Sequence, residues 1–324
     1  MENNIDLLLK RTNLGVAFDE FLNEVQSKFA SIGKVERYSP INEGYEDANI
    51  ILNATNGKYV LKIFFAEREL GNINSYIKIL RKCKNIGVQT TEILTDFNNG
   101  LGLFENNGVK TYYIITKFFE GRNFQNITPT IEDVKKVTKY ISKLNTLSFE
   151  VDHEYDSWGL KAFPDEYKNK KDKLTPEQNL LINDIYSDYT KLDVSNFSIS
   201  VIHGDMQRKH VIKNDFGEYC ILDFGCMAHD YKVIELATYL AWFCLQEDTW
   251  KDKDLIYKVV LDIYNSIHNL TEEEISSLPL LIKASYSAYY MTTSVMINEG
   301  DTSQETLDWH NRSKKMLELS KDWK

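Results

Sequence analysis

The feature that most constrains the fold is a short β-type segment inside an otherwise helical second half of the chain. Its two runs, His210–Lys213 and Tyr219–Leu222, flank a turn-rich Asn-Asp-Phe-Gly linker, which predicts a β-hairpin. The open ends of a hairpin lie side by side, so His210 at one end and Asp223 at the other are expected to meet. Asp205 lies on the loop that enters the same hairpin. The sequence therefore predicts three polar side chains at one spot.

Phosphoryl transfer is a reaction that needs such a set. A carboxylate must receive or orient the proton of the attacking hydroxyl, and further ligands must hold a divalent metal ion on the phosphates. Arg208 lies in the same loop and is one of only seven arginines, so it is a second catalytic candidate that would stabilise the charge of the transferred group. A solvated loop arginine is the alternative, and the sequence leaves both open.

Residues 1–119 are predicted to form a small, β-rich lobe that ends in a linker near residues 116–121. The expected elements are an amphipathic helix over residues 5–31, strands over 49–52, 59–64 and 112–118, and a helix over about 70–85. Asn56-Gly57, between the first two strands, is a strong hairpin signal, because both turn residues need a positive φ.

Residues 120–324 are predicted to form a larger, mainly helical lobe that carries the catalytic loop and the metal site. Residues 131–148 place apolar side chains on one helical face, and Thr175-Pro176-Glu177-Gln178 has the residues of a capping box. From about residue 230 onward the sequence predicts only helices. The expected fold class is α+β.

Two features of the β-rich lobe are candidates for binding a nucleotide. Lys62 stands in the middle of an apolar strand, where a charged residue often points to a specific partner, although a solvated strand face is the alternative. The loop over residues 42–47 contains Gly44 and is a candidate cover for phosphates. With one glycine and several acids it is a weak phosphate cradle by itself.

These residues resemble a known family in both type and spacing. His203-Gly204-Asp205, with a ligand-type residue five positions on and Asp223-Phe224-Gly225 after it, is similar to the pattern of the aminoglycoside phosphotransferase and choline kinase family. Residues 59–62 resemble the family's lysine strand, and residues 114–121 resemble its interlobe linker. The resemblance spans residues 35–245 and implies a bilobal, protein-kinase-like fold and an ATP-dependent kinase of small molecules.

The resemblance also implies roles for individual residues. Asp205 would be the catalytic base, Asp223 would ligate Mg²⁺ between the β- and γ-phosphates with His210 beside it, and His203 would be structural. Lys62 would hold α- and β-phosphate oxygens, and the linker backbone would bind adenine. The expected nucleotide-binding set is Lys62, Gly44, Thr116, Lys117, Phe118 and Phe119.

Two departures from the family pattern matter. His210 replaces a metal-binding Asn, and because imidazole suits Mn²⁺ better than Mg²⁺, we expect Mn²⁺ to support turnover at least as well. The helix at 70–83 offers no Glu to pair with Lys62, and Glu67 and Glu69 are too close to it in sequence. These departures leave a nucleotide-binding pseudokinase with a regulatory role as an alternative.

The expected acceptor is a hydroxyl of an amino alcohol, amino acid or aminated sugar, and an aminoglycoside or macrolide antibiotic is the alternative. Aromatic faces and carboxylates in the C-terminal helices would attract a cationic acceptor, whereas packing of the helix core is the simpler interpretation. The aromatic candidates are Trp242, Phe243, Trp250, Tyr286, Tyr289, Tyr290 and Trp309. The acidic candidates are Asp230, Glu235, Glu247, Asp248 and Asp301.

Charge and composition narrow the remaining classes. A net charge of −10 argues against a nucleic-acid partner. The longest apolar run, residues 240–245, is too short to span a membrane, and the N-terminus does not resemble a signal peptide. The four cysteines form no CxxC pair and do not have the spacing of a metal-binding site. We therefore expect reduced thiols in a cytoplasmic protein. The oligomeric state is left open.

Overall fold

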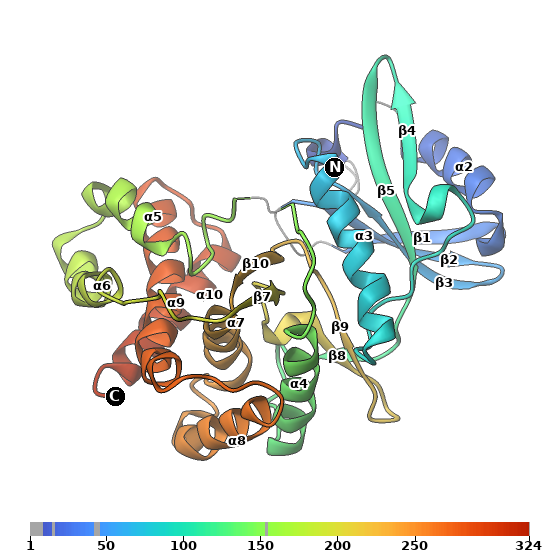
Figure 1. Cartoon of the computed structure of the whole chain (residues 1–324). Helices are drawn as coiled ribbons and strands as arrows, with labels where there is room; N and C mark the ends of the chain where they lie inside the picture. Colours follow the sequence, from blue (N-terminus) through green and yellow to red (C-terminus); the bar gives the residue numbers. More distant parts are fainter. Residues whose placement is uncertain (1–8, 15–16, 42–45, 153–154, 324) are drawn as a thin grey trace. The chain divides into compact units, whose positions relative to one another are not determined.

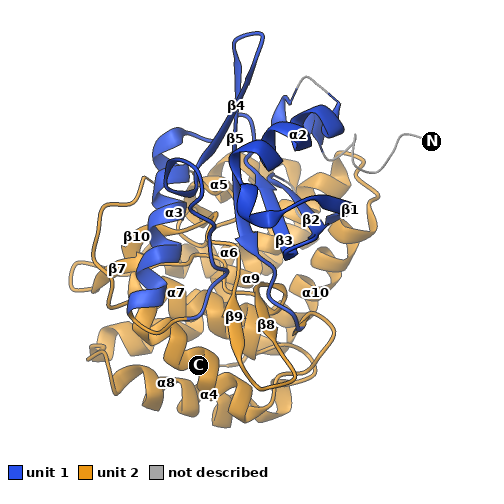
Figure 2. Cartoon of the chain, turned by 90° about the vertical axis from the view of Figure 1, so that its right-hand side faces the viewer, with its two compact units in different colours: residues 1–85, 89–121 blue, residues 86–88, 122–324 orange. Residues whose placement is uncertain are grey.

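Two compact units make up the chain (Figures 1 and 2). The first contains residues 1–85 and 89–121, and the second contains residues 86–88 and 122–324. The computed structural model describes residues 9–14, 17–41, 46–152 and 155–323.

The first unit is built on a five-stranded antiparallel sheet with the strand order β1-β2-β3-β5-β4. The strands are β1 (Val35–Ile41), β2 (Ala48–Ala54), β3 (Gly57–Ile63), β4 (Gly102–Asn106) and β5 (Val109–Lys117). β2 and β3 form the predicted hairpin, but its two turn residues are Thr55 and Asn56, because Ala54 pairs with Gly57. Of the two residues predicted to have a positive φ, only Gly57 does, at 145°. β5 contains most of the predicted third strand. β1 and β4 are strands that the sequence did not predict.

The two faces of β3 have different neighbours. Leu61 and Ile63 lie in the apolar core together with residues of α2 (Phe18–Lys28). Because side chains alternate along a strand, Lys62 points to the other face. There its ammonium lies 5.3 Å from the ring centroid of Tyr76 on α3 (Leu70–Asn85). α3 confirms the helix predicted over about 70–85, and its Tyr76 is the residue that contacts Lys62.

The N-terminal helix is shorter than predicted. In place of one helix over residues 5–31, the structure has a 3₁₀ turn η1 (Lys10–Thr12), then α2, then a second turn η2 (Ala30–Ile32). Asn13 has a φ of 50°, in the left-handed region that does not continue a right-handed helix. Residues 5–8 and 15–16 of the predicted helix lie outside the described residues.

The second unit is mainly helical. Its helices are α4 (Ile131–Leu144), α5 (Phe163–Lys170), α6 (Pro176–Tyr189), α7 (Lys232–Tyr239), α8 (Lys253–Asn265), α9 (Glu272–Asn298) and α10 (Gln304–Ser320). The longest, α9, packs against α5, α6, α7 and α10. Capping boxes at Thr130, Thr175 and Thr271 begin α4, α6 and α9, which confirms the helix start predicted at Thr175.

Two small sheets in the second unit carry the segment that the sequence singled out. β6 (Arg122–Asn123), β8 (Val211–Lys213) and β9 (Tyr219–Ile221) form one, and β7 (Ile199–Ile202) pairs with β10 (Ala228–Tyr231) in the other. Only helical elements follow β10 in the described residues, which confirms the prediction of helices from about residue 230, but β10 itself is a strand that the sequence did not predict. Four residues are too few for a periodic signal, and pairing with β7 stabilises the strand. The β7–β10 pair holds the two ends of the segment together.

In the described part of the chain, no helix combines the length and the apolar character needed to cross a bilayer. The four cysteines are free thiols, and burial raises the pKa of Cys83, Cys220 and Cys244 to about 12. Thiols kept protonated in this way are poor nucleophiles and poor metal ligands.

Candidate functional site

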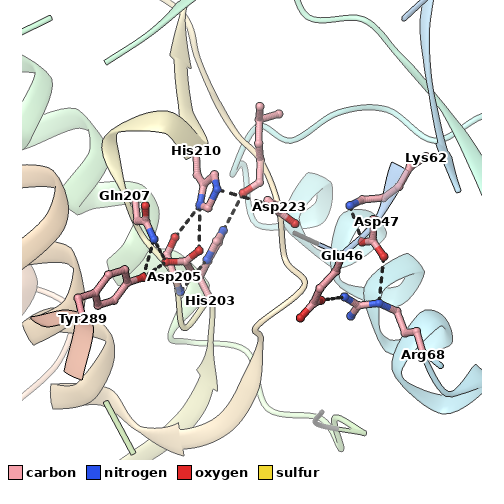
Figure 3. A network of polar contacts seen from close by, with 11 residues as sticks. Glu46, Asp47, Lys62, Arg68, His203, Asp205, Gln207, His210, Asp223 and Tyr289 are labelled. Carbon is pink, nitrogen blue, oxygen red and sulfur yellow. Dashed lines mark hydrogen bonds and ion pairs between the residues drawn. The ribbon is translucent and has the colours of Figure 1, made fainter. Parts of the chain in front are cut away.

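The predicted hairpin forms and brings its polar ends together. β8 and β9 pair antiparallel, and the N–H of Leu222 donates to the carbonyl oxygen of His210 over 2.8 Å. His210 Nε2 consequently lies 3.7 Å from Asp223 Oδ2, and His210 Nδ1 lies 3.5 Å from Asp205 Oδ2. We call Asp205, His210 and Asp223 the hairpin-end cluster (Figure 3).

A backbone hydrogen bond indicates which nitrogen of His210 carries a proton. Nδ1 lies 2.8 Å from the backbone carbonyl oxygen of Asp205, which only accepts, so Nδ1 must donate. In the neutral ring, Nε2 then keeps a lone pair that faces the carboxylate of Asp223, a second acceptor. Two facing acceptors are stabilised by a cation, and metal-ligating histidines commonly donate their other N–H to a backbone carbonyl.

This pair fits a divalent metal ion whose remaining ligands come from substrate. Within the described ranges, no group of three or more His, Cys, Asp or Glu side chains is arranged to hold a metal. Two protein ligands suffice where phosphates and water complete the shell, as is usual for Mg²⁺ on nucleotides. The side chain of Asp223 is 45% exposed, so such a ligand can approach it.

Asp205 is oriented by two side chains from different parts of the second unit. Gln207 Nε2 donates to Asp205 Oδ1 and, over 2.7 Å, to the hydroxyl of Tyr289. Tyr289, on α9, donates in turn to Asp205 Oδ1 over 3.2 Å. Burial and the neighbouring Asp205 raise the pKa of Tyr289 well above its usual value, so the phenol stays a donor. These bonds leave Asp205 Oδ2 directed toward His210.

Sequence reasoning missed this role of Gln207 and Tyr289. Gln207 lies inside the loop without any pattern that marks it. Tyr289 was considered as an aromatic contact for a cation and not as a hydrogen-bond donor. A pairing across 84 positions has no local signal.

The buried carboxyl group of Glu235 accepts hydrogen bonds from the backbone of the catalytic loop. Glu235 on α7 is fully buried, and its Oε2 accepts the N–H groups of His203 and Gly204. Burial raises the pKa of Glu235, although His203 and the two backbone donors oppose the effect. His203 Nε2 lies 2.8 Å from the carbonyl oxygen of Leu222, and burial lowers the pKa of His203. A fully buried neutral imidazole with a backbone partner is a structural residue, as predicted.

Two residues of the loop adopt left-handed backbone conformations. Gly204 has a φ of 83°, and a Cβ there would lie 2.3 Å from the carbonyl oxygen of Cys226, so only glycine fits. Asp223 has a φ of 58°. Aspartate tolerates this region better than most residues, and such conformations concentrate at functional sites.

Arg208 does not lie where its predicted role requires. Its Nη1 and Nη2 donate to the two carboxylate oxygens of Asp248 over 2.9 and 2.7 Å, and its Nε donates to the carbonyl oxygen of Phe243 over 3.1 Å. Its side chain is only 10% exposed, so the solvated-loop alternative is wrong as well. Because a bidentate carboxylate uses the guanidinium fork, we correct the prediction: Arg208 anchors the loop.

Lys62 belongs to a buried network whose central acid is Asp47. Lys62 Nζ donates to Asp47 Oδ2 over 2.7 Å. Asp47 Oδ1 accepts from the N–H of Phe65 (3.0 Å) and from Arg68 Nε (3.3 Å), and Arg68 Nη2 donates to Glu46 Oε2 over 2.6 Å. We call Glu46, Asp47, Lys62 and Arg68 the Lys62 network (Figure 3). The acid that pairs with Lys62 is therefore Asp47, the residue directly before β2, and not a residue of the helix. Lys62 is buried, so the alternative of a solvated strand face is wrong.

The remaining nucleotide-binding candidates belong to the end of β5 and the residues after it. Thr116 is buried. The N–H of Lys117 donates to the backbone carbonyl oxygen of Glu92 over 2.8 Å, and the N–H of Phe118 donates to that of Lys58 on β3 over 3.0 Å. The N–H of Phe119 has no partner among the described residues. Gly44 lies outside them.

Most aromatic candidates of the second unit are core residues, as the simpler interpretation held. Trp242, Phe243, Tyr286 and Tyr290 are buried, whereas Tyr289 and Trp309 are half-buried. The acidic candidates are also engaged. Asp230 pairs with Lys161, Glu235 supports the loop, Glu247 lies 4.0 Å from Lys315, Asp248 binds Arg208, and Asp301 accepts from Thr306.

Comparisons with known proteins agree with this geometry. The model of the phosphotransferase enzyme family matches residues 37–255. Homoserine kinase of Mesorhizobium japonicum is 21% identical over 272 residues, covering 82% of each chain. Homoserine kinase of Chelativorans sp. is 23% identical over 273 residues, covering 81% of this chain and 80% of that protein.

Solved structures show the same fold. Amicoumacin kinase hAmiN in complex with AMP-PNP, Ca²⁺ and Ami matches with a TM-score of 0.69 and 11% identity, covering 99% of this chain and 97% of that chain. Choline kinase LicA from Streptococcus pneumoniae matches with a TM-score of 0.60 and 14% identity, covering 92% of this chain and 99% of that chain. The predicted α+β, protein-kinase-like fold is confirmed. The chain belongs to the phosphotransferase enzyme family, and it is a small-molecule kinase.

Proposed function

We propose that this kinase transfers the γ-phosphoryl group of ATP to the hydroxyl of a small amino acid of the homoserine type. The observation that carries the proposal is the convergence of Asp205, His210 and Asp223 at the end of one hairpin. This set supplies a carboxylate for the acceptor and a ligand pair for a metal ion, which are the parts that phosphoryl transfer requires.

Each residue of the set has a task that its contacts support. Asp205, fixed by Gln207 and Tyr289, receives the proton of the acceptor hydroxyl as that oxygen attacks the γ-phosphorus, while the bond from the γ-phosphorus to the bridging oxygen of ADP breaks and ADP leaves. His210 and Asp223 would hold Mg²⁺ or Mn²⁺. The bound ion neutralises charge on the phosphate oxygens.

Lys62 and Phe119 are the nucleotide contacts that the structure of the first unit favours. Lys62 is held in place by Asp47, so its ammonium is positioned before a phosphate arrives. The N–H of Phe119 is a backbone donor that the described chain does not use, which suits the edge of adenine.

The amino-acid acceptor is proposed from the relatives. The curated homoserine kinases match this chain over about four-fifths of both lengths. The solved structures with the same fold are named for other acceptors, including an antibiotic and choline. Because one fold serves many acceptors, the fold does not choose between them.

A screen of acceptors tests the proposal. The purified chain is given ATP and Mg²⁺ or Mn²⁺, and ADP release is measured with L-homoserine, L-serine, choline, amino alcohols, sugars and aminoglycosides. The proposal predicts the highest kcat/KM with L-homoserine. A higher value with choline or an aminoglycoside would contradict the amino-acid assignment, and no release above background with any acceptor would contradict the kinase assignment.

A further inference from the structure

Two cations of the second unit, Lys209 and Arg312, lie close to the residues that orient Asp205. Lys209 lies in the catalytic loop, and Arg312 lies on α10. Within the part of the chain that the structure describes, neither side chain makes an ion pair or a hydrogen bond. Arg208, the neighbour of Lys209, is by contrast fully engaged by Asp248.

Both cations lie on the ring of Trp309. Lys209 Nζ is 5.7 Å and Arg312 Cζ is 5.0 Å from the ring centroid. The Trp309 ring packs against Tyr289, with centroids 5.1 Å apart, and the Tyr289 hydroxyl donates to Asp205. A continuous series of contacts therefore joins the two cations to the catalytic carboxylate.

Charges of both signs surround Arg312. Burial and the nearby Arg208 lower the pKa of Arg312, although Asp308 and Asp248 oppose the effect. Although the protein as a whole carries a net charge of −10, two cations meet at the Trp309 ring, which contacts Tyr289, one of the residues that orient Asp205. A guanidinium offers five N–H donors in a planar fork, which matches a carboxylate.

We propose that Lys209 and Arg312 bind a carboxylate group of the acceptor, so that the substrate class is a hydroxyl compound that carries a carboxylate. The inference rests on the proposed function, because it takes Asp205 as the group that receives the acceptor hydroxyl. An acceptor ammonium is disfavoured at this place, since the chain's own cations already lie on the half-buried Trp309 ring.

A pair of acceptors that differ only in the carboxylate tests the inference. L-homoserine and 3-amino-1-propanol share the hydroxyl, the amine and the carbon chain between them. The wild type is expected to prefer L-homoserine in kcat/KM, and Arg312→Met and Lys209→Met should each reduce that preference at least tenfold, because a charge-assisted contact is lost. Arg312→Lys, which keeps the charge, should recover part of it. Lys315→Met, which removes an exposed cation from the same helix, should retain the preference.

A binding measurement separates this inference from the proposed function. Calorimetric titration with L-homoserine in the presence of ADP should give a Kd at least tenfold weaker for Arg312→Met than for the wild type and Lys315→Met. The inference would be overturned if Arg312→Met and the wild type bound L-homoserine with the same Kd, or if the wild type did not bind L-homoserine. It would also be overturned if the wild type and the variants had the same acceptor preference. Binding that depends on Arg312 without turnover of either acceptor would contradict the proposed function alone.

Discussion

Each of the two units holds a cluster of charged side chains (Figure 3). Both clusters contain two carboxylates, but the carboxylates have different partners in the two clusters. The Lys62 network sets two carboxylates against one ammonium and one guanidinium. The hairpin-end cluster sets two carboxylates beside one imidazole. In the first cluster the cations hold the carboxylates in place, whereas in the second the carboxylates face a histidine ring, an arrangement that suits a metal ion.

Exposure separates the clusters in the same way. The side chain of Asp47 is 5% exposed, and that of Asp223 is 45% exposed. A buried aspartate with three donors is a structural partner, and breaking such a pair leaves an uncompensated charge away from water. A half-exposed aspartate that faces another acceptor can bind and release a ligand. Substitutions should therefore affect stability in one cluster and turnover in the other.

The largest effect is expected from Asp223→Asn. Loss of the carboxylate charge should lower kcat by about a hundredfold or more, because metal binding on the phosphates weakens. The melting temperature should change little, since the side chain is half-exposed. Steady-state kinetics and thermal unfolding of the same preparation check both statements. A stable variant with the wild-type kcat would remove Asp223 from the metal pair.

Asp47→Ala should show the opposite pattern. It leaves Lys62 and Arg68 buried without their shared acid, which should cost about 3–5 kcal/mol in the free energy of unfolding. Glu120→Ala is the matched control, because it breaks the exposed pair with Lys58 and should cost no more than about 1 kcal/mol. Denaturant titration measures both. Equal costs would show that burial of the network contributes nothing.

Arg208→Met and Asp248→Asn should have matching effects. If Arg208 anchors the loop through Asp248, each variant should lose about 1–3 kcal/mol of stability and a similar fraction of kcat. The comparison between the two variants is the test. A large loss of kcat in Arg208→Met together with normal kinetics in Asp248→Asn would restore the earlier idea that Arg208 acts on the transferred group.

A smaller, few-fold effect is expected from the choice of metal. Because an imidazole nitrogen suits Mn²⁺ better than Mg²⁺, the ratio of kcat/KM with Mn²⁺ to that with Mg²⁺ should be at least one. His210→Asn, which supplies an amide oxygen, should shift this ratio toward Mg²⁺. The measurement is kcat/KM for the wild type and for His210→Asn, each with Mn²⁺ and with Mg²⁺. A ratio unaffected by the substitution would mean that His210 is not a ligand.

The smallest effect concerns pH and lies outside both clusters. Burial lowers the pKa of His268, whose Nε2 is 2.7 Å from the carbonyl oxygen of Ser142. The unfolded chain then binds this proton more readily, so the stabilisation is complete above about pH 6.5 and is lost as the pH falls toward the lower, folded-state pKa. His268→Gln should flatten the fall in unfolding free energy between pH 7.5 and 5.5, as measured by denaturant titration at several pH values.

The comparison of clusters also shows what sequence reasoning could reach. The hairpin-end cluster was predictable because a hairpin is local, and its open ends meet whatever the rest of the chain does. Asp47 as the partner of Lys62 was not predictable, because it follows from the pairing of β2 with β3 and from the position of α3.

Arg208 shows the limit most clearly. Its rarity and its place in the loop suggested a catalytic role, but its orientation is set by Asp248, 40 positions away. The short strand β10 and the hydroxyl of Tyr289 were missed for the same reason. In each case the deciding contact is tertiary and leaves no periodic pattern in the sequence.

The central claim is that Asp205 receives the proton of a hydroxyl to which this kinase transfers phosphate. The direct measurement is the rate of phosphoester formation on L-homoserine, followed by ³¹P NMR, for the wild type and Asp205→Asn. The asparagine can still accept the bonds of Gln207 and Tyr289, so the fold should persist while the rate falls by roughly 10²–10⁴-fold. Phosphoester formation by Asp205→Asn at the wild-type rate would contradict the account.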